Sequence, residues 1–324
     1  MRTIKKKLLH SKKKWLITGV AGFIGSNLAH FLLENNQIVF GIDNIMSGKI
    51  QNLKVLKKYK NFTFFKIDLA KEFKLNLKVD YCVHLAALNS VPRSFDNPNQ
   101  VSINNISSFI NIINLANKIK IKKIVYASSS SVYGNLKNKF KNEKLPVNPI
   151  SPYAISKVSN EYFANVYAKK KMKFIGIRFF NIYGYNQSDD KKYSAVVPSW
   201  IRTLKNENKI YVYGNSLREF CYIDDAIKAI LLAIFKPIKN DHEILNVSGG
   251  NKISIKDLAI RFVKIFGNKH TSIKLKKKRI GDIIKARADL KKVKNLIGFK
   301  PTIDVDEGLD DIKKKLLQYG LLSK

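Results

Sequence analysis

A tyrosine and a lysine four residues apart, Tyr153 and Lys157, have types and spacing suited to acid–base chemistry. In a helix, this spacing places both side chains on one face, about one turn apart. A tyrosine with a pKa of about 10 is a poor base at neutral pH, and lowering its pKa by about three units requires ~4 kcal/mol of phenolate stabilisation. A cation about 4 Å away at an effective dielectric of about 20 supplies roughly that amount. The pair therefore predicts a phenol that removes a proton from a substrate hydroxyl.

A run of four serines, Ser128–Ser131, follows an apolar segment and precedes the tyrosine–lysine pair. Ser129 is expected to hydrogen-bond the reacting hydroxyl and to orient it. A Tyr-x-x-x-Lys spacing by itself is more often a solvated helix face than a catalytic pair. The catalytic interpretation is preferred here because a complete glycine motif lies upstream.

Three glycines in the segment LITGVAGFIGSNL (16–28) have the spacing G-x-x-G-x-x-G, at Gly19, Gly22 and Gly25. They follow an apolar run and open a helical pattern, so a tight turn brings backbone N–H groups and the positive end of a helix against a pyrophosphate. A larger third residue would hold the helix away from the strand. Asp43 ends the next apolar run, where a carboxylate accepts hydrogen bonds from the adenosine ribose and favours NAD over NADP. An oxidised nicotinamide ring would add a second positive charge near the phenol.

Further positions of interest end other apolar runs. Asp68 is expected to meet the adenine edge, although a surface carboxylate is nearly as good an interpretation of it. Ala86 and Ala87 are small enough to let a cofactor lie against the backbone. His84 is the one histidine of five inside a motif, and a hydrogen-bonded structural role is predicted for it. No cluster of His, Cys, Asp and Glu has metal-ligand spacing, so no metal is expected.

The elements that must position these residues alternate between apolar runs and helical patterns. Continuous apolar strands alternating with helices predict an α/β fold with a doubly wound, Rossmann-type parallel sheet that is covered on both faces. Strands are predicted at Trp15–Thr18, Ile38–Ile42, Phe62–Ile67, Tyr81–Leu85, Lys123–Ala127 and Phe174–Phe179. Helices are predicted at Gly25–Glu34, Asn105–Lys118, Ala195–Lys205, Asp224–Phe235 and Ile255–Phe266. The irregular pattern after Asn181 predicts a smaller C-terminal domain interleaved with the sheet.

The composition is strongly basic, with a net charge of +36 from 60 Lys and Arg against 24 Asp and Glu. Nearly all of the excess is lysine, whereas arginine is preferred for bidentate recognition of phosphates and bases. The lysines are also spread along the whole chain, so a compositional bias is the preferred interpretation. Weak attraction to a membrane surface comes next, and no specific nucleic-acid partner is expected.

The chain of 324 residues is long enough for one large α/β unit or two coupled domains. No apolar run reaches the ~18–20 residues needed to span a bilayer, so no integral membrane contact is expected. The basic segment Met1–Trp15 does not resemble a signal peptide, since the glycine motif follows it directly. Cys82 and Cys221 lie in apolar surroundings and are expected to be buried reduced thiols. These features predict a cytoplasmic protein.

The sequence resembles the NAD-dependent epimerase/dehydratase family of extended short-chain dehydrogenases throughout. The resemblance rests on the glycine motif, Asp43-Asn44, the serine cluster with Val132-Tyr-Gly134, the segment 151–157 and Arg178-Phe-Phe-Asn181. Within the family, the segments WLITGVAGFIGSNL (15–28), HLAALNSVPRS (84–94), YSAVVPSW (193–200) and REFCYI (218–223) are most similar to bacterial UDP-N-acetylglucosamine 4-epimerases. The similarity runs from Trp15 to about Gly308.

The resemblance implies roles for particular residues. Tyr153 would be the base, Lys157 its cationic partner and Ser129 the assisting hydroxyl. NAD would contact Gly19, Gly22, Phe23, Ile24, Gly25, Asp43, Asn44, Asp68, Leu69, Ala86, Ala87, Asn105, Tyr153 and Lys157. The sugar nucleotide would contact Asn89, Ser90, Arg93, Ser130, Ser131, Asn181, Ala195, Val196, Val197, Tyr213, Arg218, Arg279 and Asp282.

The resemblance also implies a domain division and an assembly. Residues 1–180 with about 222–248 would bind NAD, and about 181–221 with 249–324 would bind the sugar nucleotide. A homodimer would form through a four-helix bundle made by the helices around Asn105–Lys118 and Tyr153–Lys169.

The reaction implied is epimerisation at C4 of a UDP-sugar through a transient 4-keto sugar, with NAD regenerated in each turnover. Sugar dehydratases usually carry an Asp-Glu pair where this chain has serines, so epimerisation is favoured over dehydration. UDP-N-acetylglucosamine and UDP-N-acetylgalactosamine are the expected pair of sugars.

Several positions depart from the family pattern and leave the sugar open. Asn89 replaces a usual glycine, and the loop between Gly214 and Arg218 is about two residues shorter. Ile284 replaces a basic residue expected at the diphosphate, for which Lys285, Arg279 or Arg287 would have to compensate. The small Ala286 is compatible with a 2-acetamido group.

Other functions remain open at this point. The nearest alternative is epimerisation of UDP-glucose or of a UDP-hexuronic acid, and a net NAD-dependent dehydrogenase is less favoured. From another class, the chain would be a non-catalytic NAD-binding regulatory or nucleic-acid-binding protein, because fold alone does not establish catalysis.

Overall fold

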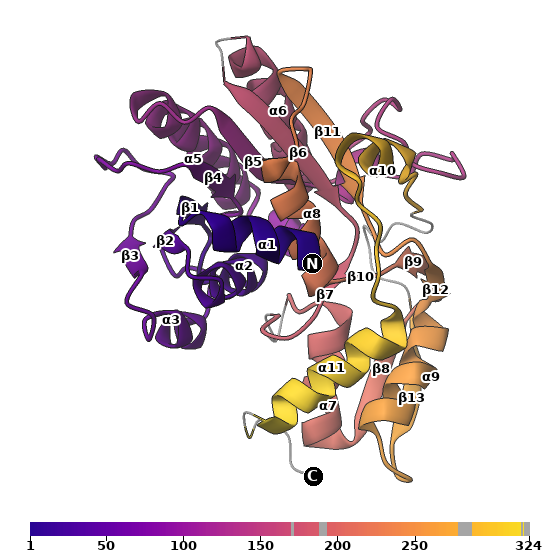
Figure 1. Cartoon of the computed structure of the whole chain (residues 1–324). Helices are drawn as coiled ribbons and strands as arrows, with labels where there is room; N and C mark the ends of the chain where they lie inside the picture. The colour runs from indigo at the N-terminus through magenta and orange to yellow at the C-terminus, as the bar shows by residue number, and fades with distance from the viewer. Residues whose placement is uncertain (170–171, 188–192, 278–286, 319, 321–324) are drawn as a thin grey trace.

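Seven parallel strands form the central sheet of the protein, in the order β11-β6-β5-β4-β1-β2-β3 (Figure 1). The computed structural model describes residues 1–169, 172–187, 193–277, 287–318 and 320. The strands are β1 (Lys14–Thr18), β2 (Ile38–Asp43), β3 (Phe62–Lys66), β4 (Tyr81–His84), β5 (Lys123–Ser129), β6 (Lys173–Phe179) and β11 (His242–Val247). The predicted Rossmann-type sheet is confirmed, and the strand order reverses between β1 and β4.

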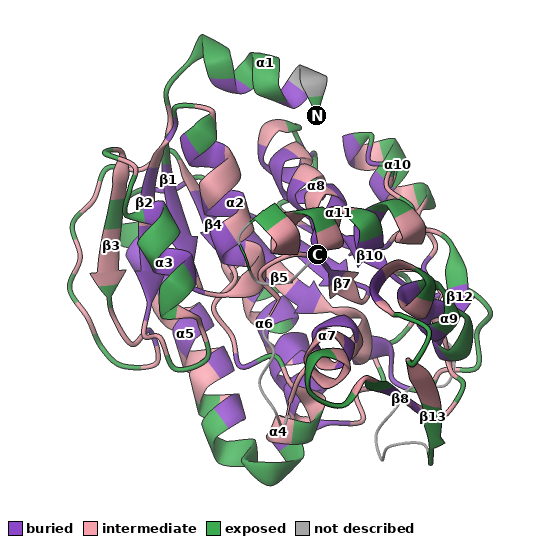
Figure 2. Ribbon diagram, turned by 90° about the horizontal axis from the view of Figure 1, so that it is seen from below, coloured by how far each residue is buried: buried purple, intermediate pink, exposed green. Residues whose placement is uncertain are grey.

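Helices cover both faces of the sheet, so each strand is apolar on both sides. Helices α2 (Phe23–Glu34), α3 (Ile50–Leu56) and α8 (Ile223–Phe235) belong to the core on one face. Helices α5 (Pro98–Lys118) and α6 (Pro152–Ala168) belong to the core on the other. Along β1, Trp15 and Ile17 join the first core and Leu16 the second, as alternation along a strand requires. Figure 2 shows the buried residues on the strands and on the inward sides of these helices.

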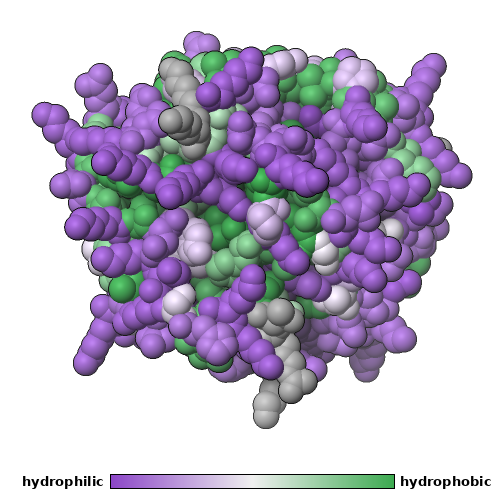
Figure 3. Space-filling model, turned by 45° about the horizontal axis from the view of Figure 1, so that its top comes forward, coloured by the Kyte–Doolittle hydropathy of each residue, from purple (hydrophilic) through white to green (hydrophobic). Residues whose placement is uncertain are grey.

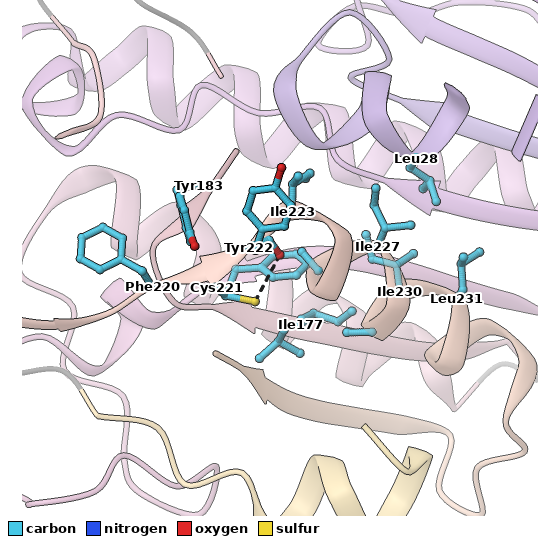
Figure 4. Close-up of a cluster of buried hydrophobic side chains, with 14 of the residues drawn as sticks. Leu28, Ile177, Tyr183, Phe220, Cys221, Tyr222, Ile223, Ile227, Ile230 and Leu231 are labelled. Atoms are coloured by element: carbon cyan, nitrogen blue, oxygen red, sulfur yellow. Dashed lines mark hydrogen bonds between the residues drawn. The ribbon is translucent and has the colours of Figure 1, made fainter. Parts of the chain in front are cut away.

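The first core extends from the sheet toward the smaller part of the molecule. Figure 4 shows apolar side chains of α8, including Ile227 and Ile230, gathered with Leu28 and Ile177. The short parallel pair β7 (Ile182–Tyr183) and β10 (Cys221–Tyr222) continues this cluster. The Cys221 thiol is buried and donates a hydrogen bond to the Tyr222 carbonyl oxygen over 3.6 Å (Figure 4).

The smaller part lies at the lower end of the molecule in Figure 1. It contains α7 (Val196–Glu207), β8 (Lys209–Tyr213), β9 (Leu217–Glu219), β12 (Lys252–Ser254), α9 (Ile255–Phe266) and β13 (Ser272–Lys276). Strand β13 pairs in parallel with β8, and β12 pairs antiparallel with β9. The chain continues through α10 (Lys291–Ile297) and α11 (Val305–Gln318). The remaining helices are α4 (Val91–Asp96) and the short 3-10 helix η1 (Ser130–Tyr133).

The predicted elements are present, with ends that differ by a few residues. The largest difference is at α5, which begins at Pro98 rather than Asn105. The elements that were not predicted include strand β11 of the large sheet and the N-terminal helix α1 (Arg2–His10), which packs through buried Ile4 and Leu8. Within the described part of the chain, no helix is both long and apolar enough to cross a membrane.

Candidate active site

One large cavity opens at the carboxyl ends of the strands, where the strand order reverses. Its volume is about 600 Å³, which is within the usual range of small-molecule sites. Residues that follow β1, β2, β4 and β5 line one end, and residues of α7, β8 and β9 line the other. Ligands bind at this position in doubly wound sheets because the loops after neighbouring strands diverge there.

The glycine turn between β1 and α2 forms the floor of this cavity. Gly19 has φ +70°, and a Cβ there would lie 2.7 Å from the backbone nitrogen of Ala86. A Cβ on Gly25 would collide with the Gly19 carbonyl oxygen, so the third glycine allows the helix to approach the strand, as the sequence predicted. Helix α2 begins after Gly22 without a side-chain cap and without an acidic residue in its first turn. Its first backbone N–H groups therefore suit an anionic diphosphate.

Two carboxylates lie at the same end of the cavity. Asp43 is buried and accepts hydrogen bonds from the backbone N–H groups of Ala21 (2.9 Å) and Ile45 (2.7 Å). Burial raises the pKa of Asp43, and these hydrogen bonds oppose that rise. Asp68 accepts a hydrogen bond from the backbone of Ala70 and a longer one from Asn44. Because each carboxylate has about four acceptor positions, both retain capacity for ribose or adenine donors.

Tyr153, Lys157 and Ser129 meet at the centre of the cavity. Ser151 caps α6 by accepting a hydrogen bond from the backbone N–H of Ala154, and Pro152 occupies the first helical position. This start places Tyr153 in the first turn, where its phenol is hydrogen-bonded to Ser129 at the end of β5. The Lys157 ammonium lies 5.8 Å from the Tyr153 ring centre and donates to the Ala127 carbonyl oxygen over 2.9 Å.

The charge states of these groups follow from burial. Burial raises the pKa of the Tyr153 phenol, and the hydrogen bond with Ser129 lowers it in part. Burial also lowers the pKa of Lys157 to about 8, so its ammonium stays mostly charged at neutral pH. Burial therefore leaves the pKa of the Tyr153 phenol above its ordinary value, whereas the sequence pattern predicted that Lys157 would lower it. A second positive charge beside the phenol would favour its phenolate.

A buried polar network lies directly behind the serine cluster. Glu161, one turn beyond Lys157 on α6, accepts a hydrogen bond from the Ser128 hydroxyl over 2.6 Å. It also accepts two hydrogen bonds from the Arg178 guanidinium. Arg178 stacks on the Tyr133 ring, 4.6 Å from its centre. The network ties the ends of β5 and β6 to α6.

His84 is buried beside this centre and makes a hydrogen bond of 2.9 Å with the Thr18 hydroxyl. Burial lowers its pKa to about 3, and the charge of Lys157 acts in the same direction. The side chain is therefore neutral and structural, in line with the sequence prediction.

Comparison with known proteins identifies the family. The model of the NAD-dependent epimerase/dehydratase family matches residues 15–248. The chain belongs to this family. It is 34% identical to a putative UDP-glucose 4-epimerase of Methanocaldococcus jannaschii, over 91% of this chain and 95% of that protein. It is 32% identical to the UDP-glucuronate 4-epimerase of Thermodesulfobacterium geofontis, over 91% of this chain and 93% of that protein.

Among solved structures, the fold matches the UDP-N-acetylglucosamine 4-epimerase of Methanobrevibacter ruminantium M1 in complex with UDP-N-acetylmuramic acid. The TM-score is 0.87 at 31% identity, covering 95% of this chain and 99% of that one. Membership of the NAD-dependent epimerase/dehydratase family confirms the expectations of an NAD cofactor and of an isomerase.

Nearly all of the sequence-predicted site residues line the cavity. On the NAD side these include Phe23, Ile24, Leu69, Ala86 and Ala87 with the glycines and carboxylates described above. On the sugar-nucleotide side they are Asn89, Ser90, Arg93, Ser130, Ser131, Asn181, Ala195, Val196, Val197, Tyr213 and Arg218. Arg279 and Asp282 lie outside the described residues, as do Ile284, Lys285 and Ala286.

Asn105, which was predicted to contact NAD, is not among the residues that line the cavity. Its side chain is fully buried. The amide oxygen accepts a hydrogen bond from the backbone N–H of Leu88 over 2.8 Å, and the amide nitrogen donates to the Leu88 carbonyl oxygen and to the Ser156 hydroxyl. Asn105 therefore fixes the loop after β4 against α6. Arg287 is likewise not at the cavity: its guanidinium stacks on Phe140 and lies 3.7 Å from Glu219.

Several lining residues were missed in the sequence. Tyr211 lies two residues before Tyr213 on β8 and so shares its strand face, and Trp200 donates from its indole nitrogen to the Tyr211 carbonyl oxygen. The alternation Tyr-x-Tyr was the available signal for this aromatic wall. Tyr193 also lines the cavity, and the Arg93 guanidinium stacks 4.6 Å from the centre of the Tyr193 ring. The Tyr193 hydroxyl donates a hydrogen bond to the Asp96 carboxylate over 2.8 Å. This contact joins α4 to the segment before α7.

Proposed function

We propose that the protein catalyses NAD-dependent 4-epimerisation of a UDP-sugar, with UDP-N-acetylglucosamine and UDP-N-acetylgalactosamine as the interconverted pair. The observation that carries this proposal is the phenol of Tyr153 held between Ser129 and Lys157 inside the cavity. Among the described residues of the cavity lining, the carboxylates are Asp43 and Asp68, both at the dinucleotide end. A carboxylate pair for eliminating water is therefore lacking from the described part of the sugar end, which favours epimerisation.

The residues of the chain account for proton transfer at the sugar O4. Bound NAD would supply the hydride acceptor for the sugar C4 and a second positive charge beside the phenol. Tyr153 takes the proton from the 4-hydroxyl as its phenolate, while Ser129 donates a hydrogen bond that holds the oxygen in place. Lys157 stabilises the phenolate by charge. After the 4-keto sugar turns over, the hydride would return to the opposite face of C4, and Tyr153 returns the proton to the oxygen.

The site residues support NAD at this position. The glycine turn lets a diphosphate approach to the backbone, and the uncapped start of α2 presents N–H groups to it. Asp43 would accept hydrogen bonds from the ribose hydroxyls, and its negative charge would repel a 2′-phosphate. Asp68 and Asn44 would border the adenosine end.

The sugar nucleotide would occupy the other end of the cavity. Arg218 is proposed to meet the diphosphate, and Asn181 with Ala195, Val196 and Val197 to line the sugar and nucleotide. The aromatic wall of Trp200, Tyr211 and Tyr213 suits a base that stacks on rings.

A hexuronic acid is the second candidate, and Arg93 favours it. The Arg93 side chain lines the cavity and stacks on Tyr193, so a guanidinium stands near the proposed sugar end. A carboxylate at C6 would pair with that cation, whereas an acetamido group would not. The related UDP-glucuronate 4-epimerase adds support to this alternative.

The division of the chain into two domains is also part of the proposal. Residues 1–180 with about 222–248 would form the NAD-binding domain, supported by the pairing of β11 with β6 in the large sheet. Residues 181–221 with 249–324 would form the sugar-nucleotide domain, supported by the separate small sheets of β8 with β13 and β9 with β12.

We propose further that two copies of the chain associate through α5 and α6. Ile103 on α5 is 61% exposed, and Ile155, Tyr162 and Val166 on α6 are between 52% and 64% exposed. An unpartnered row of large apolar side chains on two packed helices is suited to a matching row on a second copy. The result would be a four-helix bundle.

Proton NMR of the purified protein with UDP-N-acetylglucosamine, UDP-glucose and UDP-glucuronic acid, each without added NAD, tests the reaction and the sugar together. Appearance of the 4-epimer from the acetylated sugar supports the proposal and shows that NAD stays bound. Preference for the acid moves the substrate to the second candidate. A lasting accumulation of NADH points to a dehydrogenase, and no turnover even with NAD supplied favours a non-catalytic NAD-binding protein.

A further inference from the structure

The two edges of the central sheet carry different charges. In a parallel sheet all strands start at one edge, so connections that are far apart in the sequence meet there. The amino edge consists of the first residue of each strand and the five residues before it. The described residues of this edge include fourteen lysines: Lys12, Lys13, Lys14, Lys57, Lys58, Lys60, Lys78, Lys118, Lys120, Lys122, Lys123, Lys169, Lys173 and Lys239. They include only three acidic residues, Glu34, Asp80 and Asp241.

The opposite edge is nearly neutral. The last residue of each strand and the five residues after it contain the lysines Lys66, Lys71 and Lys252, and the acidic residues Asp43 and Asp68. The whole chain has 60 basic and 24 acidic residues, so the amino edge is more basic than the average composition. A compositional bias alone would make both edges similarly basic, so it does not explain why the lysines gather at the amino edge.

Most of the amino-edge lysines are available to a partner. Eleven of the fourteen are exposed, and the other three, Lys13, Lys123 and Lys173, are partly buried. The ammonium of Lys123 donates to the Lys236 carbonyl oxygen over 2.8 Å, and that of Lys173 donates to the Ile238 carbonyl oxygen over 2.7 Å. Within the described part of the chain, none of the eleven exposed lysines forms an ion pair.

We propose that the amino edge docks on an anionic lipid surface. Strands β6 and β11 begin near the top of the molecule in Figure 1, and the smaller part lies at the bottom. Figure 3, which brings the top forward, shows a face covered mostly by hydrophilic side chains. Cavity residues follow the strands at the opposite edge, so a docked molecule keeps its active site open to solution.

The composition of the edge favours lipid over nucleic acid. All of its basic residues other than histidine are lysines, whereas nucleic-acid recognition prefers arginine and exposed aromatic rings for stacking. The large apolar side chain exposed on this edge is Leu9, at 71%, next to the exposed Lys5, Lys6 and Lys7 of α1. A leucine among lysines suits a headgroup region, where the acyl boundary is near.

Seven strands spaced about 4.8 Å apart make an edge roughly 30 Å wide. Each lysine near an anionic surface strengthens binding about fivefold, and the effect fades beyond a Debye length of about 8 Å at physiological salt. Because the sheet twists, only part of the edge meets a plane at one time. Removing three lysines that face the surface should therefore weaken binding by up to about a hundredfold.

Sedimentation with lipid vesicles tests the proposal on the full chain. Vesicles of phosphatidylcholine mixed with phosphatidylglycerol should bind the protein at low salt, and vesicles of phosphatidylcholine alone should not. A triple variant, Lys118→Gln, Lys122→Gln and Lys239→Gln, should lose most of this binding. The matched control is Lys256→Gln, Lys264→Gln and Lys269→Gln, three exposed lysines on and after α9 that remove the same charge.

Three results would overturn the proposal. The first is no binding to anionic vesicles even at low salt. The second is equal loss in the edge and control variants, which would mean that net charge and not this edge is responsible. The third is tighter binding to duplex DNA or single-stranded RNA than to the vesicles at matched salt, again dependent on the edge lysines. Thermal melts of both triple variants confirm that each is folded.

Discussion

Glu161 holds the guanidinium of Arg178 by two hydrogen bonds, from Nε over 2.8 Å and from Nη2 over 2.6 Å. Both side chains are nearly fully buried. Burial lowers the pKa of Arg178, but the hydrogen bonds and charge of Glu161 outweigh this effect and hold the pKa above its ordinary value. The pair joins α6 to β6, the strand next to the serine cluster.

Glu161→Ala should destabilise the protein by about 3–5 kcal/mol, because it leaves a buried charge without its partner. Arg178→Met should lower the free energy of unfolding by a similar amount. The double variant should lose clearly less stability than the sum of the two single losses. Urea unfolding of the four proteins measures this coupling. Additive losses would show that the pair does not act as a unit.

Tyr153→Phe should retain bound NAD and lose activity by about 10²–10⁴-fold, the usual contribution of a general base. The ring stays in place, so only the proton transfer is removed. Tyr162→Phe is the matched control, since Tyr162 lies on the same helix but is 64% exposed. Turnover is followed by NMR, and bound NAD by its release on denaturation. Full activity of Tyr153→Phe would refute the assignment of the base.

Asp43→Asn should reduce the preference for NAD over NADP by about tenfold, equivalent to ~1.4 kcal/mol. The carboxylate charge that repels a 2′-phosphate is lost, while one acceptor for the Ala21 and Ile45 N–H groups remains. Dissociation constants for both dinucleotides provide the measurement. Asp241→Asn, an exposed residue before β11, serves as control. An unchanged ratio of the two constants would remove Asp43 from the ribose site.

The contribution of two buried histidines to stability should fall with acid between about pH 6.5 and pH 4. Burial lowers the pKa of His84 to about 3 and that of His242 to about 4. The unfolded chain therefore binds protons that the folded chain does not, so stability is full above pH 6.5 and declines as pH falls. Each histidine contributes up to ~1.4 kcal/mol per pH unit in this window.

His242→Gln should flatten this acid decline by removing one of the two contributions. The glutamine keeps a polar group near the Tyr126 hydroxyl, which lies 2.9 Å from the His242 ring nitrogen. Urea midpoints across the pH range give the slope. The same substitution at exposed His270 should leave the slope as it is, and an equal change in both variants would contradict the explanation.

Val166→Asp should convert a dimer into a monomer without changing the cavity, because Val166 is 59% exposed on α6. A charge placed on an apolar contact between copies has no partner there. Light scattering coupled to gel filtration measures the mass. Val55→Asp, at an exposed position on α3, is the control. A wild-type protein that is already monomeric would refute the proposed bundle.

The sequence was sufficient for six of the seven strands of the large sheet and for the pairing of Tyr153 with Lys157, because both depend on local patterns. A glycine was predicted to be needed at position 25 because the helix contacts the strand there. In the structure, a Cβ on Gly25 would collide with the Gly19 carbonyl oxygen. Tyr153 and Lys157 needed only helical spacing to be paired. Strand β11 was missed because its run His242–Val247 begins with polar residues and has no glycine motif to mark it.

Contacts between distant segments were beyond the sequence patterns. Asn105 looked like a cofactor contact, but its amide is occupied by Leu88, seventeen residues away in the chain. The stacking of Arg93 on Tyr193 joins positions a hundred residues apart, and no periodicity marks it. The amino-edge lysines looked dispersed along the chain, and only the parallel order of the strands brings them together.

The uncapped start of α2 would make the fraction of folded chains depend on the concentration of the dinucleotide. Backbone N–H groups at a helix start are ordinarily satisfied by a side chain worth about 1 kcal/mol, and Gly22 provides none. A diphosphate that binds only the folded chain shifts the unfolding equilibrium by mass action, by about 2.7 kcal/mol at a hundredfold excess over its dissociation constant. Newly made chains would thus become fully stable only after they bind the dinucleotide. Cells short of the dinucleotide would degrade the unbound chains faster by proteolysis.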